Sequence, residues 1–196
     1  LNCLDINKMR SHIMKTEPEF IINCTGIVKQ NPLINNMALS IELNSLFPHC
    51  LSNMSKDFGF KLINFSTDCV FSGKSGNYKE EDCADAVDTY GRTKFLGEVK
   101  EKNCITIRTS FIGHELFNKW GLISWFLSQK NQVKGFKNVM YSGLTTLEIA
   151  KIIEKYIFPN KTLEGLYHVS SIPIDKYTLL QIINNIYQKN IYIKKD

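Results

Sequence analysis

The residues in this sequence with the clearest chemical potential are Tyr90 and Lys94, which lie four positions apart. On a helix, positions i and i+4 share one face, so the tyrosine hydroxyl and the lysine ammonium can point into the same space. A phenol has a pKa of about 10, too high for acid–base work at neutral pH, and a neighbouring ammonium favours the phenolate and lowers that pKa. The spacing predicts a general acid, although a solvent-exposed helix face carries the same pattern when taken alone.

A third polar group, Thr67, precedes this pair and follows an apolar segment at 60–65. Ligands of open α/β sheets bind beyond the carboxyl ends of the strands, which is where this hydroxyl is expected. A strand-end hydroxyl, a tyrosine and a lysine four residues later form an arrangement that supports hydride transfer to a carbonyl. The hydroxyl polarises the carbonyl oxygen, the tyrosine donates the proton, and the lysine tunes the tyrosine and holds the cofactor ribose.

The elements that must position these residues show as apolar segments that alternate with helical patterns. Strands are predicted at 19–24, 60–65, 104–108 and 165–169. Helices are predicted at 35–57, with a break or a new first turn at Pro48, at 90–100, after a capping box at 145–148, and beyond Pro173. A long loop is predicted at 72–88. The alternation indicates an α/β fold with a parallel sheet covered by helices.

The composition excludes several classes of protein. The chain has 196 residues, of which 43% are hydrophobic and 22% charged, and its net charge of +5 is spread along the sequence. A nucleic-acid binder would instead show a dense basic stripe, so no nucleic-acid partner is predicted. No apolar stretch has the length of a membrane span and no secretory signal is visible, so we expect a soluble, cytoplasmic protein. The cysteines and histidines lack metal-ligand spacing, so no metal site is predicted.

The motifs continue in order along the chain. Residues 64–73 read N-F-S-T-D-C-V-F-S-G, followed by Tyr78, Glu80 and Asp82, and then residues 90–98 read Y-G-R-T-K-F-L-G-E and residues 108–110 read R-T-S. This series resembles the extended short-chain dehydrogenase/reductases, and within them most closely the dTDP-4-dehydrorhamnose reductase branch of sugar-nucleotide enzymes. The resemblance covers nearly the whole chain, and the combined motifs are far more specific than Y-x-x-x-K alone.

The resemblance implies a Rossmann-like parallel sheet with a smaller, interdigitated substrate-binding part. Residues 1–112 would form an incomplete dinucleotide-binding part, and residues 113–196 a substrate-binding part packed against it. The catalytic roles would fall on Thr67, which polarises the sugar carbonyl, Tyr90, which donates the proton, and Lys94, which holds the nicotinamide ribose. Cofactor contacts would fall on Asp5, Ile6, Gly26, Ile27, Val28, Phe65, Tyr90 and Lys94, and substrate contacts on Thr67, Asp68 and Phe111.

Two features depart from the family pattern. The family holds the cofactor phosphates on a glycine-rich turn after its first strand, and this sequence contains no G-x-G-x-x-G. The first βαβ unit is therefore missing, so the chain is either a fragment of a complete enzyme or unable to bind a dinucleotide normally. We expect residues 1–196 alone to self-associate and to lack measurable NAD(P)H affinity at micromolar cofactor. Cys69 stands where the branch usually has a tyrosine, which bears on the choice of substrate.

The resemblance implies a reductase of a nucleotide-linked 4-keto-deoxysugar that uses NADP or NAD, serves deoxysugar and polysaccharide synthesis, and forms a homodimer. Its partner would be a nucleotide-diphosphate sugar, with Lys134 and Lys137 as further residues to test against the diphosphate. Asn44 is open to two interpretations, a helix-surface amide or a residue that orders a water near the lysine. Two other functions stay open: a sugar-nucleotide epimerase or dehydratase with tightly held NAD, and a non-catalytic binding subunit that resembles the regulatory subunit of methionine adenosyltransferase.

Overall fold

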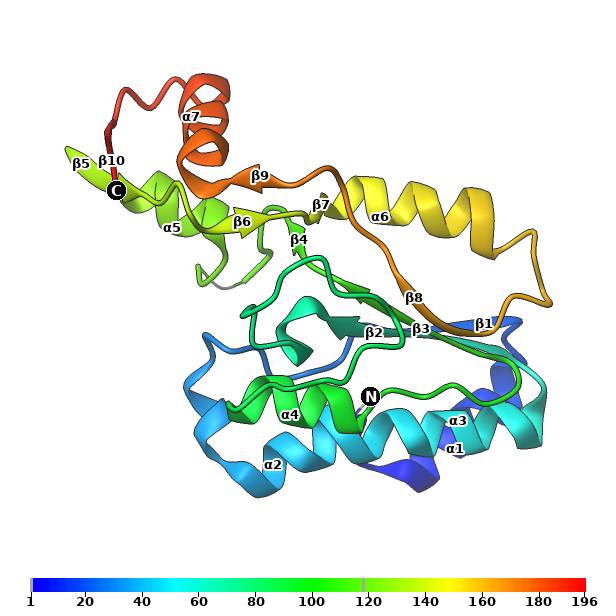
Figure 1. The fold of residues 1–196 in the computed structure, drawn as a ribbon. Helices are drawn as coiled ribbons and strands as arrows, with labels where there is room; N and C mark the ends of the chain where they lie inside the picture. The colour runs from blue at the N-terminus through cyan, green and yellow to red at the C-terminus, as the bar shows by residue number, and fades with distance from the viewer. Residues whose placement is uncertain (1, 118) are drawn as a thin grey trace. The chain divides into compact units, whose positions relative to one another are not determined.

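The computed structural model describes residues 2–117 and 119–196, which divide into two compact units (Figure 1). The first unit comprises the chain up to Thr109 together with Glu154–Val169, and the second comprises Ser110–Ile153 and Ser170–Asp196. The main change of unit thus falls three residues before the expected boundary at 112. Residues 154–169, which the prediction placed in the second part, belong to the first unit because they contain the fourth strand of its sheet.

The first unit is built on a parallel sheet, as predicted. Its strands are β1 (Phe20–Asn23), β2 (Lys61–Thr67), β3 (Cys104–Thr109) and β8 (Gly165–His168), in the order β1-β2-β3-β8. Every neighbouring pair runs parallel. The central strands β2 and β3 are almost wholly buried, which is typical of parallel sheets, whereas the edge strands β1 and β8 are mostly half-buried. All four carboxyl ends therefore point to the same edge of the sheet.

Helices α1 (Ile6–Thr16), α3 (Phe47–Phe58) and α4 (Thr89–Leu96) lie along one face of this sheet (Figure 1). Short 3₁₀ helices occur at Pro32–Asn35 and Asp68–Val70. The apolar side chains of α1 and α3 meet those of β2 and β3 in a buried cluster that includes Ile13, Leu51, Met54, Phe60 and Leu62. Burial of this cluster, rather than helix propensity, holds α1 and α3 on the sheet.

The helix predicted at 35–57 is divided into α2 (Met37–Ile41), a π-helix (Glu42–Leu46) and α3. Pro48 lies in the first turn of α3, as one of the two predicted outcomes has it. A proline has no N–H to give to the carbonyl four residues earlier and its ring crowds that carbonyl. For Pro48 this carbonyl belongs to Asn44. The helix widens to a π turn at Glu42–Leu46, around this residue.

The second unit has a separate core and three two-stranded sheets. Strands β4 (Phe111–Ile112) and β7 (Leu144–Thr145) pair in parallel, as do β5 (Gln132–Gly135) and β10 (Tyr192–Lys195), whereas β6 (Met140–Tyr141) and β9 (Ile174–Asp175) pair antiparallel. Its helices are α5 (Leu122–Ser128), α6 (Thr146–Ile152) and α7 (Lys176–Ile186), and the π-helix Ile153–Ile157 leads back to the first unit. The core of the unit includes Phe126, Val133, Leu180, Ile183 and Ile193.

The helix start predicted at 145–148 is confirmed, since the Thr145 hydroxyl accepts the N–H of Glu148 at 3.2 Å and caps α6. Helices α1 and α5 were not predicted. The short strand pairs were not predicted either, because segments of two to four residues carry no periodicity of their own. Within the described parts of the chain, no helix has the length and apolar character needed to cross a bilayer.

Candidate active site

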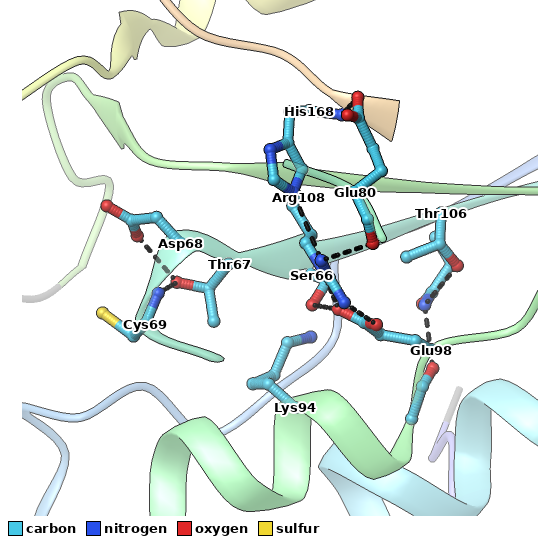
Figure 2. Close-up of polar contacts among 12 residues, drawn as sticks. Ser66, Thr67, Asp68, Cys69, Glu80, Lys94, Glu98, Thr106, Arg108 and His168 are labelled. Carbon is cyan, nitrogen blue, oxygen red and sulfur yellow. Dashed lines mark hydrogen bonds and ion pairs between the residues drawn. The ribbon is translucent and has the colours of Figure 1, made fainter. Parts of the chain in front are cut away.

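Thr67 is the last residue of β2 and lies at the carboxyl edge of the sheet, where the sequence places it. Its side chain is buried, accepts the N–H of Cys69 at 3.1 Å and donates to the Asp68 carboxylate at 3.1 Å (Figure 2). These two bonds turn the chain sharply out of the strand into a 3₁₀ turn. The hydroxyl is thereby fixed at the strand end rather than left to rotate.

Helix α4 packs its first turn directly on this 3₁₀ turn. A Cβ on Gly91 would lie 2.2 Å from the Cys69 carbonyl oxygen and 2.5 Å from the Cβ of Ala86, so only a glycine permits the approach. Asp88 caps the helix by accepting the Gly91 N–H at 2.8 Å. Tyr90 is the second residue of the helix after this cap. The close approach of Gly91 to Cys69 brings the Tyr90 phenol to Thr67. The expected meeting of Tyr90 and Thr67 is present.

Burial raises the pKa of Tyr90 to about 12, and the nearby groups Cys69, Asp68 and Asp88 add to the rise, while a hydrogen bond with the Thr67 side chain opposes it. The prediction that Lys94 brings this pKa down is therefore wrong for the structure described. The physical reason is that loss of water around the phenol is the largest effect, the neighbouring acidic groups act in the same direction, and only the Thr67 hydrogen bond opposes them. The consequence is a Tyr90 hydroxyl that carries its proton throughout the neutral range.

Lys94 lies one helical turn after Tyr90 and its side chain rises from α4 towards β2 (Figure 2). Lys94 is 7% exposed, and its ammonium donates to the carbonyl oxygen of Phe65 at 2.6 Å. Burial lowers the pKa of Lys94 to about 8, against the opposing effects of Glu98 and Cys24. The bare helix-surface interpretation of Y-x-x-x-K is excluded, because Lys94 is buried and bonded to the strand that ends in Thr67.

The turn at 26–28 approaches the same lysine. A Cβ on Gly26 would lie 3.8 Å from the Lys94 Nζ and 3.0 Å from the Asn44 amide oxygen. Asn44 is fully buried and holds both backbone groups of Ile27, accepting its N–H at 2.7 Å and donating to its carbonyl at 3.1 Å. Its amide also donates to Thr93 at 3.1 Å. Asn44 thus fixes the turn to α4, and the helix-surface interpretation of this residue is wrong.

Beyond α4, the segment 97–99 is bonded to the sheet by side chains from two neighbouring strands. Asn64 of β2 donates to the Gly97 carbonyl at 3.0 Å, and Thr106 of β3 bonds both the N–H and the carbonyl of Val99. Between them the buried Glu98 carboxylate receives Ser66 and Arg108 (Figure 2). The end of α4 is therefore fixed as firmly as its beginning.

The Glu98–Arg108 ion pair is a feature that the sequence analysis did not assign to the site. It is bidentate, with Arg108 Nε to Glu98 Oε1 at 2.7 Å and Nη2 to Oε2 at 2.8 Å, and both side chains are nearly inaccessible to solvent. Arg108 also lies over the Phe71 ring at 4.9 Å and within 3.2 Å of His168 Nε2. The signal in the sequence was the glutamate that ends the 90–98 motif and the arginine that begins R-T-S.

The remaining predicted residues lie elsewhere in the fold. Asp5 caps α1 by accepting the Lys8 N–H at 3.1 Å, and Ile6 packs on the core of the first unit. Val28 is exposed and Asp68 is held by Thr67. Phe111 begins β4 in the second unit and is half exposed. None of these positions by itself tests the predicted contacts with cofactor or substrate.

The two lysines considered for a diphosphate have acidic partners in the second unit. Lys137 donates to Asp175 at 3.0 Å and to Thr178 at 3.3 Å, and Lys134 pairs with Asp196 at 3.2 Å. Lys137 thus anchors the start of α7, where Asp175 is the N-cap. Among the residues described, no three His, Cys, Asp or Glu side chains lie together as metal ligands would.

Comparison with known proteins adds a family. The sequence profile of the family described as RmlD substrate binding domain matches residues 1–187. The dTDP-4-dehydrorhamnose reductase of Aggregatibacter actinomycetemcomitans is 28% identical over 169 residues, which is 80% of this chain and 57% of that protein. Methionine adenosyltransferase 2 subunit beta of Bos taurus is 31% identical over 98 residues, which is 50% of this chain and 29% of that protein.

Among solved structures, the dTDP-4-dehydrorhamnose reductase of Bacillus anthracis, in complex with NADP, superimposes with a TM-score of 0.85 at 20% identity. The match covers 100% of this chain and 72% of that one. A likeness at that identity shows the same fold. The chain spans 29–62% of the length of the curated relatives it matches.

Proposed function

Since this chain belongs to the RmlD substrate-binding domain family, we propose that it carries the catalytic residues of a reductase of a nucleotide-linked 4-keto-deoxysugar that uses NADPH or NADH. The observation that carries the proposal is the meeting of Thr67, Tyr90 and Lys94 at the carboxyl edge of one sheet. The same three residue types are those that hydride transfer to a carbonyl requires. The similarity to dTDP-4-dehydrorhamnose reductases over four-fifths of the chain supports the choice of sugar.

In this proposal each residue has one task. The Thr67 hydroxyl hydrogen-bonds the sugar carbonyl oxygen, and Tyr90 gives that oxygen its proton as the carbonyl is reduced. A pKa of about 12 keeps the Tyr90 proton in place until negative charge develops on the substrate. Lys94 supplies a buried positive charge beside the phenolate that remains. A bound reduced nicotinamide would supply the hydride.

The residues around Lys94 fit the nicotinamide-ribose end of such a cofactor. Gly26 has no side chain to occupy the space beside the Lys94 ammonium, and Asn44 fixes the turn to which Gly26 belongs. An ammonium has three donors, and ribose hydroxyls are suitable acceptors. Gly26, Ile27, Phe65 and Lys94 would hold this end. Asp5, Ile6 and Val28 are proposed for the same cofactor on the family resemblance alone, as Asp68 and Phe111 are for the sugar nucleotide.

The test is turnover of dTDP-4-keto-6-deoxy-sugar with NADPH, followed by the loss of reduced nicotinamide and by analysis of the sugar product. It is made on the chain alone and on the chain preceded by the glycine-rich βαβ unit of a solved reductase. We expect turnover only with that unit, and loss of it in Tyr90→Phe. A product epimerised without net consumption of NADPH would establish an epimerase in place of a reductase.

A second candidate is a non-catalytic binding subunit, because half of the chain is 31% identical to methionine adenosyltransferase 2 subunit beta. A chain that lacks turnover but raises the activity of a methionine adenosyltransferase, with Tyr90→Phe acting like the wild type, would establish this function. The buried Thr67, Tyr90 and Lys94, gathered at the end of β2, favour the reductase, since binding alone does not require them.

A homodimer is the proposed assembly. Large apolar side chains are exposed on the α2 and π-helix segment and on α4, which contact each other in the first unit. They are Met37, Ile41, Leu46, Phe95 and Leu96. Sedimentation velocity of the wild type and of Leu46→Glu tests this surface: a dimer that Leu46→Glu dissociates supports the proposal, and a monomeric wild type contradicts it.

A further inference from the structure

The buried pair Glu98–Arg108 lies at the centre of a network that joins three strands and α4. Ser66, Arg108 and His168 are register partners across β2, β3 and β8. The Glu98 carboxylate takes the Ser66 hydroxyl at 2.8 Å and the Arg108 guanidinium at 2.7 and 2.8 Å (Figure 2). Glu98 lies just past the end of α4. Two members of the network are close in sequence to the site: Ser66 directly precedes Thr67 on β2, and Glu98 is four residues after Lys94.

Three consecutive residues of β2 each bind a different part of α4 and its end. Phe65 offers its carbonyl to Lys94, Ser66 donates to Glu98, and Thr67 meets Tyr90. Tyr90 and Lys94 share one face of α4, and Glu98 follows just past the helix end, after the C-cap Gly97. Glu98 is the last of these three contacts and the one that carries a negative charge.

Stability alone does not account for such a pair. A buried ion pair often stabilises a fold no better than apolar side chains of the same volume, because both charges lose their water. The pair is instead well suited to fix geometry and to place a fixed negative charge near a buried ammonium. The titratable groups that act on Lys94 are Glu98 beyond α4 and the Cys24 thiol beyond β1, and Tyr90 lies four residues earlier on α4. Those that face Glu98 are Arg108, with Glu80 and His168 behind it.

We propose that Glu98 is a positioning residue for the reaction: fixed by Arg108 and Ser66, it joins the segment after α4 to β2 and keeps the Lys94 ammonium in place at the Phe65 carbonyl. The catalytic consequence rests on the proposed function, whereas the effect of Glu98 on Lys94 is a property of the fold. Removal of the carboxylate leaves the ammonium buried without its main opposing charge, so Lys94 loses its proton at lower pH.

The test is a pH titration of the Lys94 ¹³Cε resonance in uniformly labelled protein, assigned by its absence in Lys94→Arg. In Glu98→Gln we expect the midpoint to fall by about one pH unit, the shift that a neighbouring opposite charge produces. The matched control is Glu80→Gln, which removes an acid on the far side of Arg108 and should leave the midpoint unchanged. A merely structural role for Glu98 predicts lower stability with an unmoved midpoint.

If Glu98→Gln does not fold, the double variant Glu98→Gln/Arg108→Met is used, since it leaves no unpaired buried charge. A smaller fall of the Lys94 midpoint is expected there, because the double variant also removes the positive charge of Arg108. An unchanged midpoint in a folded variant, or an equal fall in Glu80→Gln, would overturn the proposal. Turnover separates the two proposals. If the wild type is inactive but the Lys94 midpoint falls in Glu98→Gln, only the reductase is refuted. If the wild type is active and the Lys94 midpoint is the same in Glu98→Gln, only the role of Glu98 is refuted.

Discussion

Gly91 lies against the backbone carbonyl of Cys69 so closely that a Cβ on this glycine would be 2.2 Å from the carbonyl oxygen. This one contact sets the distance between the first turn of α4 and the end of β2, and with it the meeting of Tyr90 and Thr67. The sequence shows the glycine beside the tyrosine but not the carbonyl that requires it.

Gly91→Ala is therefore expected to destabilise the protein by about 1–3 kcal/mol, the range for overpacked sites. In a helix without such crowding, alanine is more stable than glycine by about 1 kcal/mol, so the sign of the change in unfolding free energy shows whether the Cys69 contact is tight. Denaturant unfolding measures it. The control is Gly121→Ala at the N-cap of α5, whose nearest atoms belong to the end of the Glu115 side chain and not to the backbone. A more stable Gly91→Ala would show that the turn at Cys69 yields readily.

Tyr90→Phe is expected to lower turnover by about 10²–10⁴-fold, because it removes only the proton donor. Cofactor affinity should stay near that of the wild type, since the ring and its packing remain. Steady-state kinetics and cofactor titration, both on the form preceded by a βαβ unit, provide the measurement. Equal rates for wild type and variant would exclude Tyr90 as the acid.

Lys94 makes the free energy of unfolding depend on pH. Its pKa is about 8 in the folded protein against an ordinary value of 10.5, so between these values the unfolded chain binds more protons. Stability from this group therefore rises with pH across that window, by about 3 kcal/mol in total, and is absent below it. Relative to Lys94→Met, the wild type should gain stability from pH 8 to pH 10.5. A constant difference between the two unfolding curves would contradict the burial of the charge.

Arg108→Met should destabilise the protein by about 3–5 kcal/mol, because it leaves the Glu98 carboxylate buried without its partner. The double variant Glu98→Gln/Arg108→Met should recover much of that loss. A double-mutant cycle of unfolding free energies measures the coupling. Additive effects of the two substitutions would mean that the pair is not coupled in solution.

Substrate contacts are tested by Thr67→Val and Phe111→Ala in the form preceded by a βαβ unit. Thr67→Val removes the hydroxyl that polarises the carbonyl, so turnover should fall more than substrate affinity. Phe111→Ala should mainly raise the KM for the sugar nucleotide. Unchanged sugar kinetics in Phe111→Ala would remove this residue from the proposed substrate contacts.

The strand–helix alternation, the parallel sheet and the trio Thr67, Tyr90 and Lys94 could all be predicted from the sequence. Each depends on a local pattern: apolar strands that end in polar residues, and a four-residue helical spacing. The family motif at 90–98 also pointed to Glu98 and Gly91 by position, although it assigned them no task.

Only the tertiary structure decided the electrostatics and the supports of the site. Burial, which depends on the whole surrounding fold, raised the pKa of Tyr90, opposite to the expected direction, and lowered the pKa of Lys94, for which no direction was expected. The bonds of Asn44 to Ile27 and of Glu98 to Arg108 join residues from different elements, and no local pattern encodes such pairs. Sequence spacing fixes which side chains share a helix face, whereas desolvation and partner choice depend on what the rest of the chain places against that face.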